Sequence, residues 1–521
     1  VSEVVVPYVL DVDLRDVPAA PVWQPGDPIE VVPEGLAADF SGEVDPNWVD
    51  PVRQSSAGAP EYVGTLERAF LAHPFGGLAP PDVVGDVGPN HYISMVNASR
   101  FAIWDKLGNP LVPATTLSAL WTASGGGSSN CTSGYGDPIV QYDELADRWL
   151  MSEFAQSGNH LCVYVSRGAD PVTSGWFVYD FSTPSFPDYP KYSVWSDAYY
   201  VSTFESPLLG IYALDRVSML AGAPATYQRF TIPQLTGTSP RVTRILPADH
   251  DGVQAPPAGL PNLFVRTVDD TQDNSNPTDR IEVWEYHVDF ATPGNSTFAN
   301  TQNLTPAAFT LLPCTGSPAR NCVPQPGTAA MLDALFNRAM RRLAWRVVDG
   351  TARMVVTQVV DAGGGIAGKR WWELRSDTSS SPVWSIFQEG TYSPDSVGRF
   401  MGSVAMNASG DIALGYTASD ATSVLPAIRV TARLDGDPAG VMTMDELTIK
   451  DGEGVQTWTQ RWGDYSSMNV DPADGQTFWY TNEIIQPNGL WETWVGAFSL
   501  DGIFSDGFEL GDTTAWTRTK P

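Results

Sequence analysis

The chain has 521 residues, with 60 acidic and 30 basic side chains and a formal net charge of −30. A charge of this sign repels phosphate backbones, so we expect no nucleic-acid partner. No apolar run approaches the length of a membrane-spanning helix. The chain also has no P-loop, dinucleotide fingerprint, Gly-x-Ser-x-Gly turn or zinc-protease helix, and we expect no organic cofactor.

A short phrase recurs along the chain: an apolar strand, a turn opened by Asp or Asn, and a second strand of aromatic and β-branched residues. Its turns begin at Asp86, Asp143, Asp197, Asp349, Asn407 and Asp471. One such unit cannot bury its apolar face alone, and repetition at this spacing is typical of propellers. With 47 Gly, 42 Pro and little helical periodicity, the sequence predicts an all-β, seven-bladed β-propeller. Six or eight blades are the alternatives.

Residues 1–80 are rich in Val, Pro and Asp, and we expect an extended N-terminal arm that packs on the propeller or completes one blade. The propeller is expected over residues 81–500, with an inserted loop at about 303–335. Within it, a single convincing helix is predicted over residues 329–342. The tail, residues 501–521, forms a separate motif. The blades are expected to begin near residues 81, 137, 192, 246, 341, 399 and 462.

The four cysteines fall into two closely spaced pairs, Cys131 with Cys162 and Cys314 with Cys322. Zinc sites usually contain Cys-x-x-Cys or nearby histidines, so the pairs predict two disulfides in preference to a metal site. Disulfides are typical of oxidising compartments. We therefore expect a secreted, extracellular protein whose signal peptide has been removed.

Several phrases together carry a resemblance: PDVVGDVGPNHY (81–92), GDPIVQYDELADRW (136–149), RWGDYSSMNVDP (461–472) and FWYTNE (478–483). They resemble a family of secreted bacterial β-propeller proteins of unassigned activity, over about residues 80–500. The resemblance implies a fold and no activity. The tail phrase FSDGFELGDTTAW (504–516) resembles a C-terminal segment of secreted proteins of some Gram-negative bacteria, which implies bacterial export.

Three arginines, Arg342, Arg399 and Arg461, fall near the same position of the last three expected blades. Converging guanidinium groups can hold a carboxylate bidentately, and sialidase-like propellers, to which the chain has a loose similarity, bind an acidic sugar in this way. The nearby candidates for catalysis are Asp464, Tyr465 and Glu483, because sialidases pair a tyrosine nucleophile with a carboxylate. The alternative is that each arginine pairs with an aspartate of a neighbouring blade.

His250 is flanked directly by aspartates on both sides, which makes it a candidate general base or metal ligand. A satisfied polar turn is the alternative. Two acidic loops offer clustered oxygen ligands suited to Ca²⁺, although neither has the spacing of an EF-hand. Their candidate ligands are Asp269, Asp270, Asp471 and Asp474. Solvated loops are the alternative there.

The sequence thus leads to the hypothesis of a secreted propeller that engages an extracellular glycan or cell-surface component. It would act as a glycoside hydrolase or lyase on an acidic sugar chain. The rival hypothesis is a noncatalytic extracellular binding or structural scaffold, in which the arginines hold the blades together. Fold alone does not decide between them. Convergence of the arginines, Tyr465 and a carboxylate on one pocket would support an enzyme.

Overall fold

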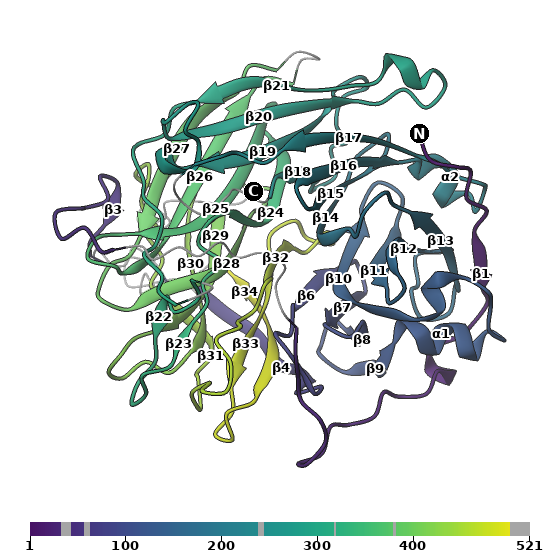
Figure 1. Ribbon diagram of the computed structural model, residues 1–521, viewed down its shortest axis with the longest axis horizontal. Coiled ribbons are helices and arrows are strands. Elements are labelled where there is room, and N and C mark those ends of the chain that lie inside the picture. Colours follow the sequence, from purple (N-terminus) through teal and green to yellow (C-terminus); the bar gives the residue numbers. More distant parts are fainter. Residues whose placement is uncertain (33–42, 57–62, 238–243, 317–318, 379–381, 501–521) are drawn as a thin grey trace, which may run out of the picture.

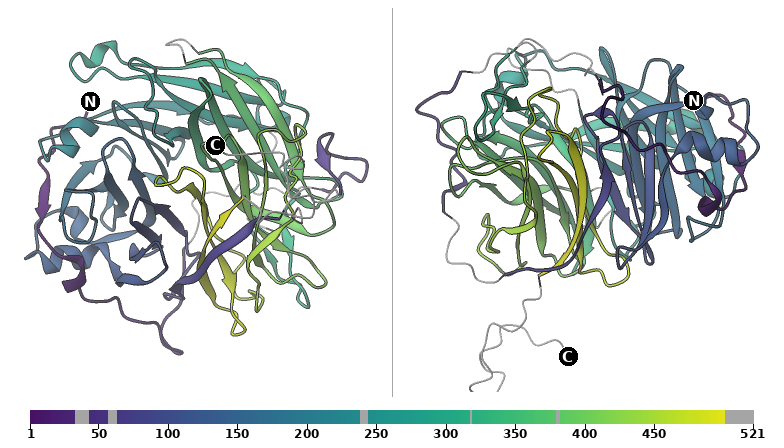
Figure 2. Two further views of the ribbon diagram at one scale, coloured as in Figure 1. Left: turned by 180° about the vertical axis from the view of Figure 1, so that it is seen from behind. Right: turned by 90° about the horizontal axis from the view of Figure 1, so that it is seen from below.

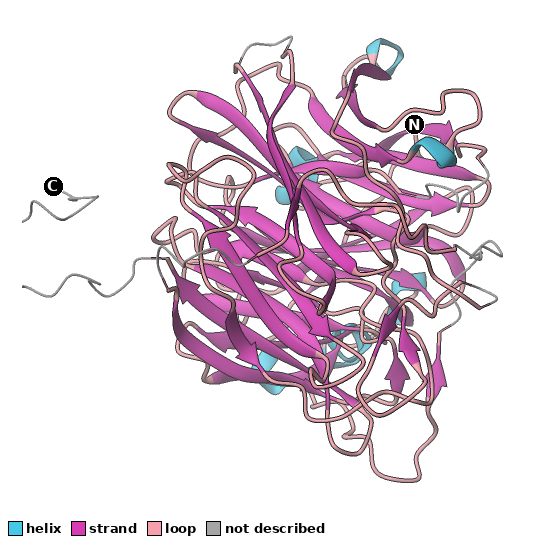
Figure 3. Cartoon of the chain, turned by 90° about the vertical axis from the view of Figure 1, so that its left-hand side faces the viewer, coloured by secondary structure: helices cyan, strands magenta, loops and turns pink. Residues whose placement is uncertain are grey.

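The computed structural model describes residues 1–32, 43–56, 63–237, 244–316, 319–378 and 382–500. Strands dominate these residues, and helices are few and short (Figure 3). The helices are α1 (Leu117–Ala123), α2 (Arg216–Leu220), η1 (Leu14–Asp16), η2 (Asn130–Thr132), η3 (Asp270–Gln272) and η4 (Pro293–Asn295). The predicted all-β class is confirmed. The tail expected at 501–521 lies outside the described residues.

Strand pairing gives four antiparallel sheets of four strands, a five-stranded sheet and a nine-stranded sheet, besides two pairs of short strands. The five-stranded sheet is a set of four antiparallel strands with one added N-terminal strand, and the nine-stranded sheet joins two such sets and another N-terminal strand. We call the seven successive sets of four antiparallel strands units 1–7; they surround a common centre (Figure 1). Unit 1 contains β6 (Val84–Val87), β7 (His91–Val96), β8 (Arg100–Asp105) and β9 (Pro110–Thr116). Unit 2 contains β10 (Gly134–Asp143), β11 (Arg148–Ala155), β12 (Gly158–Ser166) and β13 (Trp176–Ser182). Units 3 and 4 contain β14 (Asp188–Val194), β15 (Tyr199–Glu205), β16 (Leu208–Leu214) and β17 (Tyr227–Pro233), then β18 (Leu246–His250), β19 (Asn262–Val268), β20 (Arg280–His287) and β21 (Thr297–Leu304).

The last three units follow the same plan. Units 5 and 6 contain β24 (Ala339–Val348), β25 (Thr351–Asp361), β26 (Ala367–Ser376) and β27 (Ser385–Tyr392), then β28 (Gly398–Met406), β29 (Ile412–Ser419), β30 (Ala427–Arg433) and β31 (Leu447–Lys450). Unit 7 contains β32 (Ser467–Val470), β33 (Phe478–Ile485), β34 (Trp491–Ser499) and β4 (Thr65–Pro74). Its outermost strand therefore comes from the N-terminal part of the chain.

The first strands of the units, β6, β10, β14, β18, β24, β28 and β32, lie nearest the centre (Figure 1). Each contacts the first strand of the next unit, and β32 contacts β6, so these contacts form a cycle. Between units 4 and 5 the contact is a short parallel ladder, in which Ala248 pairs with Leu343. The charged groups at the ends of these strands can therefore meet across unit boundaries.

The Asp and Asn residues of the recurring phrase organise the turns between strands. The Asp143 carboxylate accepts hydrogen bonds at 3.1 Å from the backbone N–H groups of Leu145 and Ala146. The Asn407 side-chain oxygen accepts bonds at 2.9 Å from Ser409 and Asp411 in the same way. Short polar side chains that bond the backbone two to four residues ahead stabilise tight turns, which explains why these residues recur.

Burial changes from the centre of the molecule to its rim. Every residue of β28 is buried, since this strand is covered on both faces by neighbouring units, whereas exposed and half-buried residues alternate along the outer strand β21. Strands covered on both faces tolerate few unpaired polar groups. Ionisable side chains near the centre must therefore form ion pairs or hydrogen bonds within the protein, stay in their neutral form, or bind a partner of opposite charge.

The N-terminal segment runs over the outside of the units (Figure 2). Its strand β1 (Tyr8–Leu10) extends unit 2 by pairing with β13, and β3 (Arg53–Gln54) pairs in parallel with β27. Strand β2 (Glu30–Val31) pairs with β5 (Leu78–Ala79). These pairings distribute the segment over several units before β4 completes unit 7.

The helix predicted over residues 329–342 is wrong. This segment contains β23 (Met331–Leu332), which pairs with β22 (Val323–Pro324), and the beginning of β24. Helix propensity is a weak prior that tertiary packing overrides. Here β24 pairs with β18 on one side and β25 on the other, and almost all of its side chains are buried.

The structure contains the disulfides Cys131–Cys162 and Cys314–Cys322. The first joins η2 to β12, and the second closes a short loop in the connection from β21 to β24. Both pairings are those the sequence predicts. Among the residues described here, no helix is long and apolar enough to cross a membrane.

Candidate functional site

Residues other than glycine adopt left-handed backbone conformations at the start of the first strand in most units. Left-handed φ angles cost free energy in such residues, and this strain concentrates at functional sites. The residues with left-handed φ angles at these strand starts are Asp82 (φ 45°), Asp137 (48°), Tyr189 (54°), Leu335 (45°), Met401 (44°) and Asp464 (67°). This end of the first strands is therefore the best candidate for a functional site.

Three of these strained residues are aspartates from units 1, 2 and 7, which are consecutive around the cycle. Asp82, Asp137 and Asp464 are 1%, 7% and 5% exposed. One oxygen of Asp82 accepts a hydrogen bond from Asn97 Nδ2 at 2.8 Å, and Asp137 accepts one from the Tyr189 backbone N–H at 2.9 Å. Arg461 forms an ion pair of 2.7 Å with Asp464.

Burial and mutual repulsion favour the protonated carboxylic acid at two of these positions. Burial raises the pKa of Asp82 well above its usual range, and the negative charges of Asp464 and Asp137 add to this increase. Burial also raises the pKa of Asp137, again with a contribution from Asp464. A carboxyl group that keeps its proton near neutral pH can act as a general acid.

Tyr465 and Glu483, both predicted site residues, lie beside these aspartates. Tyr465 is 1% exposed, and burial followed by the charge of Asp137 raises the pKa of its phenol well above the usual range. Glu483 accepts a hydrogen bond of 2.5 Å from the backbone N–H of Gly463, and burial raises its pKa as well. The structure thus brings Asp464, Tyr465, Glu483 and Arg461 together, as neighbours of Asp82 and Asp137.

The buried amine of Lys191 completes the arrangement, and burial lowers its pKa well below the usual range. Lys191 Nζ lies 3.3 Å from the ring centroid of Tyr189 and 3.7 Å from that of Tyr465. The Tyr189 hydroxyl donates a hydrogen bond of 3.0 Å to the backbone carbonyl of Asp464, which connects units 3 and 7. We refer to the following residues as the entry cluster: Asp82, Asp137, Tyr189, Lys191, Arg461, Asp464, Tyr465 and Glu483.

The other two predicted arginines have carboxylate partners outside the entry cluster. Arg342 Nε lies 2.9 Å from Asp249, which belongs to the neighbouring unit 4. Arg399 forms ion pairs of 2.7 Å with both Asp395 and Glu446. These contacts are the kind that the alternative interpretation, structural ion pairing, predicts. Of the three arginines, only Arg461 belongs to the entry cluster.

His250 lies at the opposite end of its strand from the entry cluster. It ends β18 and is 3% exposed. Its Nε2 lies 3.0 Å from the backbone carbonyl of Gln254. Burial lowers the pKa of His250, which favours the neutral imidazole. The structure therefore does not bring His250 together with Tyr465 and its neighbours.

The two acidic loops differ. Asp269, Asp270 and Asp279 place one carboxylate oxygen each within 4.8 Å of one another, the only such trio of His, Cys, Asp or Glu in the described residues. Both oxygens of Asp279 accept backbone hydrogen bonds, and Asp269 bonds Thr271. In the second loop, Asp471 is paired with Lys106 at 2.5 Å and Asp474 caps the turn at Gln476. Calcium binding stays a prediction.

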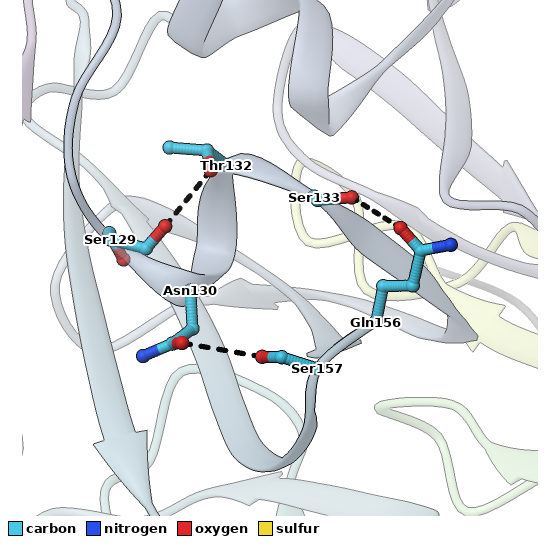
Figure 4. Close-up of a pocket in the computed structure, with 6 residues that line it drawn as sticks. All are labelled: Ser129, Asn130, Thr132, Ser133, Gln156 and Ser157. Carbon is cyan, nitrogen blue, oxygen red and sulfur yellow. Dashed lines mark hydrogen bonds between the residues drawn. The ribbon is translucent and has the colours of Figure 1, made fainter.

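A shallow depression of about 370 Å³ lies beside the first disulfide, and none of the residues that line it belongs to the entry cluster (Figure 4). The six side chains that line it are neutral and partly bonded to one another, as Ser133 is to Gln156 at 2.7 Å. They are Ser129, Asn130, Thr132, Ser133, Gln156 and Ser157. No titratable group lines this depression, so it offers no acid–base chemistry.

Sequence reasoning missed Asp82, Asp137, Tyr189 and Lys191. A usable signal was present for one of them, because Gly136-Asp137 and Gly463-Asp464 both place a Gly-Asp pair before or within a first strand. Aligning these pairs would have marked Asp137 as the counterpart of Asp464. Asp82 lacks the preceding glycine, and nothing in the sequence indicates that Lys191 packs between two tyrosines.

No protein-family model and no curated protein sequence matches the chain. Among solved structures it is similar to the WD40 domain of SCAP from fission yeast, with 10% identity over 83% of this chain and 98% of that chain and a TM-score of 0.35. It is also similar to an exo-β-1,3-galactanase from Phanerochaete chrysosporium, with 9% identity over 84% of this chain and 97% of that chain and a TM-score of 0.27. A third similar structure is NanB sialidase from Streptococcus pneumoniae, with 10% identity over 88% of this chain and 98% of that chain and a TM-score of 0.20. Scores this low assign neither a fold nor an activity, so function must be inferred from the residues.

Proposed function

We propose that units 1–7 are the blades of a closed seven-bladed propeller, formed by residues 81–500 together with β4 from the N-terminal arm. The cycle of contacts among the seven first strands supports closure. The pairing of β4 with β34 supports it further, since it places a strand of the N-terminal arm in the same blade as the last strands of the propeller. We also propose that the protein is secreted and extracellular, in keeping with its two disulfides.

We propose that the entry cluster hydrolyses a glycosidic bond. The observation that carries this proposal is the gathering of Asp82, Asp137 and Asp464, from three units, on strained backbone at one end of the first strands. Glycoside hydrolysis requires two carboxyl groups in different protonation states. In this proposal Asp82 retains its proton and donates it to the leaving oxygen, while Asp464, held by Arg461, acts as the base or nucleophile.

The remaining predicted residues act by positioning. Glu483 holds the backbone N–H of Gly463, the residue directly before Asp464, and so fixes the strained turn that presents this carboxylate. Tyr465 lies between Asp137 and Lys191 and keeps its hydroxyl proton, because its pKa is raised. It therefore serves as a hydrogen-bond donor in this proposal, in place of the nucleophile role expected from the sequence.

The second candidate function is a noncatalytic scaffold. It is favoured by one observation: Arg342 and Arg399 are buried and paired with carboxylates, as structural residues would be. The entry cluster is also largely buried, as a structural arrangement of charges would be. A direct assay separates the two functions.

The experiment measures release of reducing sugar from a panel of plant, bacterial and animal polysaccharides. Wild type is compared with Asp82→Asn and Asp464→Asn, and with Asp11→Asn as a control whose carboxylate is 86% exposed. Loss of a catalytic acid or base is expected to lower the rate at least about 100-fold. The melting temperature is measured alongside. It should change little in Asp82→Asn, which replaces a protonated acid by a neutral amide, and should fall in Asp464→Asn, which removes the ion pair with Arg461, so the rate of that variant counts only where it is folded.

The outcomes are distinct. Hydrolysis by wild type and Asp11→Asn that both cluster variants lose would support the enzyme. Full activity in Asp82→Asn and Asp464→Asn would place the chemistry elsewhere and refute the assignment of these residues. Failure of the wild type to release sugar from any polysaccharide in the panel would leave the scaffold as the better function.

A further inference from the structure

The entry cluster is divided into an acidic and a basic side. Its aspartates come from units 1, 2 and 7, whereas cationic groups from units 3, 4 and 5 surround the ring of Tyr189. Lys191 Nζ, Arg244 Cζ and Arg338 Cζ lie 3.3, 4.1 and 5.1 Å from that ring centroid. An arrangement with opposite charges on two sides orients any ligand that carries one charged group.

Arg341 forms the inner boundary of the basic side. It lies on β24 of unit 5, yet its guanidinium donates hydrogen bonds to Ser467 Oγ of unit 7 at 2.6 Å and to the Val140 carbonyl of unit 2 at 3.2 Å. The side chain therefore crosses the centre of the molecule. It lies a few residues further along the first strands than Asp137 and Asp464 do.

The charges of Lys191 and Arg341 are not balanced by ion pairs. No carboxylate of the described residues lies within 4.0 Å of Lys191 Nζ or of the Arg341 guanidinium. Lys191 donates to the carbonyl of Pro190 at 3.1 Å, and Arg341 Nε has no hydrogen-bond partner within the described chain. The two residues are 2% and 3% exposed.

Holding positive charge here is costly: burial lowers the pKa of Lys191 well below its usual range, an effect that the charge of Asp137 only partly opposes, and burial lowers the pKa of Arg341 as well. The other buried arginines of the central strands show the usual solution: Arg342 and Arg399 each contact two carboxylates. Lys191 and Arg341 depart from this rule at the place where the strained aspartates gather. A negative group supplied by a ligand would remove the imbalance.

We propose that Lys191 and Arg341 bind the carboxylate of an acidic sugar unit, so that the substrates of the entry cluster are uronate-containing glycans. The reaction in this inference rests on the proposed glycosidic activity. The choice of an acidic ligand rests on the basic side of the cluster. A guanidinium matches the planar carboxylate with parallel N–H donors. The negative charge of the ligand would in turn favour the protonated form of Lys191, which then adds a second positive charge. Neutral glycans would leave both cations unpaired.

The test measures binding by calorimetry at constant ionic strength. The probes are short oligomers from polygalacturonate, alginate and hyaluronate, each compared with the same oligomer after chemical reduction of its carboxylates to alcohols. Sodium acetate is the free-anion probe. Wild type is compared with Lys191→Met, Arg341→Gln and the control Arg15→Gln, whose side chain is 61% exposed.

At least one uronate oligomer should bind wild type and Arg15→Gln about 10-fold or more tighter than its reduced form. Lys191→Met and Arg341→Gln should each lose most of this preference while binding the reduced form as before. Arg341 contacts two other units, so its variant is used only if its melting temperature shows that it folds; Lys191→Met tests the proposal independently. Equal binding of charged and reduced oligomers, no binding of any oligomer, or acetate binding as tightly as the best oligomer would overturn it.

The two proposals can fail separately. Uronate binding that depends on Lys191 and Arg341, without hydrolysis of any polysaccharide, would keep the carboxylate subsite and refute the enzyme. Hydrolysis that depends on Asp82 and Asp464 but is indifferent to carboxylate reduction would keep the enzyme and refute the subsite.

Discussion

Glu153 offers a sharp test of how this protein handles buried charge. It lies on β11, is 1% exposed, and accepts a hydrogen bond from the Tyr164 hydroxyl at 2.9 Å. A Cβ added to Gly134 would lie 1.6 Å from Glu153 Oε2, so the carboxyl group packs directly on the facing backbone. Burial raises the pKa of Glu153 from 4.5 to about 7, although the hydrogen bond from Tyr164 opposes the increase.

The raised pKa of Glu153 sets the direction and the size of the change in folding stability with pH. Between pH 4.5 and about 7 the folded protein holds a proton on Glu153 that the unfolded chain has lost, so stability falls as the pH rises through this window. One pKa unit corresponds to about 1.4 kcal/mol, so the loss is about 3 kcal/mol. With an unfolding entropy of about 2.1 cal/mol/K per residue, this corresponds to about 3 °C in melting temperature for a chain of this length.

The change Glu153→Gln keeps the shape of the side chain and removes its ionisation. We expect wild type and variant to melt at similar temperatures near pH 4.5, and the variant to melt about 3 °C higher near pH 8. The assay is calorimetry at several pH values across this range. A constant difference at every pH would refute the reasoning, because it would show that Glu153 does not change its charge state within the window.

Three further predictions concern stability. Arg342→Gln leaves Asp249 without its ion pair and Asp251 with only its ion pair to Arg346, and it should lower stability by about 3–5 kcal/mol; a calorimetric melting temperature equal to wild type would contradict this. The Cys131–Cys162 disulfide spans 31 residues and the Cys314–Cys322 disulfide 8, so replacing the first pair by serine should cost about 1 kcal/mol more in urea unfolding than replacing the second; the reverse order would argue against loop entropy as the main term. If Ca²⁺ binds at Asp269, EDTA should lower the melting temperature of wild type and not of Asp269→Asn, whereas identical responses would remove calcium from this loop.

Much of the fold could be predicted because its signals are local. The turn residues Asp143 and Asn407 bond backbone groups only two to four positions away, so a single phrase contains the whole interaction. Strand alternation is equally local. Local signals also gave one wrong prediction. The apolar spacing over residues 329–342 fits a helix, but pairing with β18 and β25 makes β24 a strand.

The candidate site could be predicted only in part. Asp464, Tyr465, Glu483 and Arg461 lie within a short stretch of sequence, and they do meet in the structure. The remaining members lie hundreds of residues away along the chain. Nothing about Asp82 by itself indicates that the pKa of its carboxyl group is raised by burial and by Asp464.

By itself, then, the sequence determined most of the strands, the turns and the pairing of four cysteines, because each depends on residues close together in the chain. Only the tertiary structure decided which charges meet. Asp82 and Asp464 become neighbours when β32 contacts β6, and Arg341 reaches Ser467 and Val140 only across the centre that the first strands enclose. Long-range electrostatic contacts depend on how the strands surround that centre, and no local pattern of residues records this arrangement.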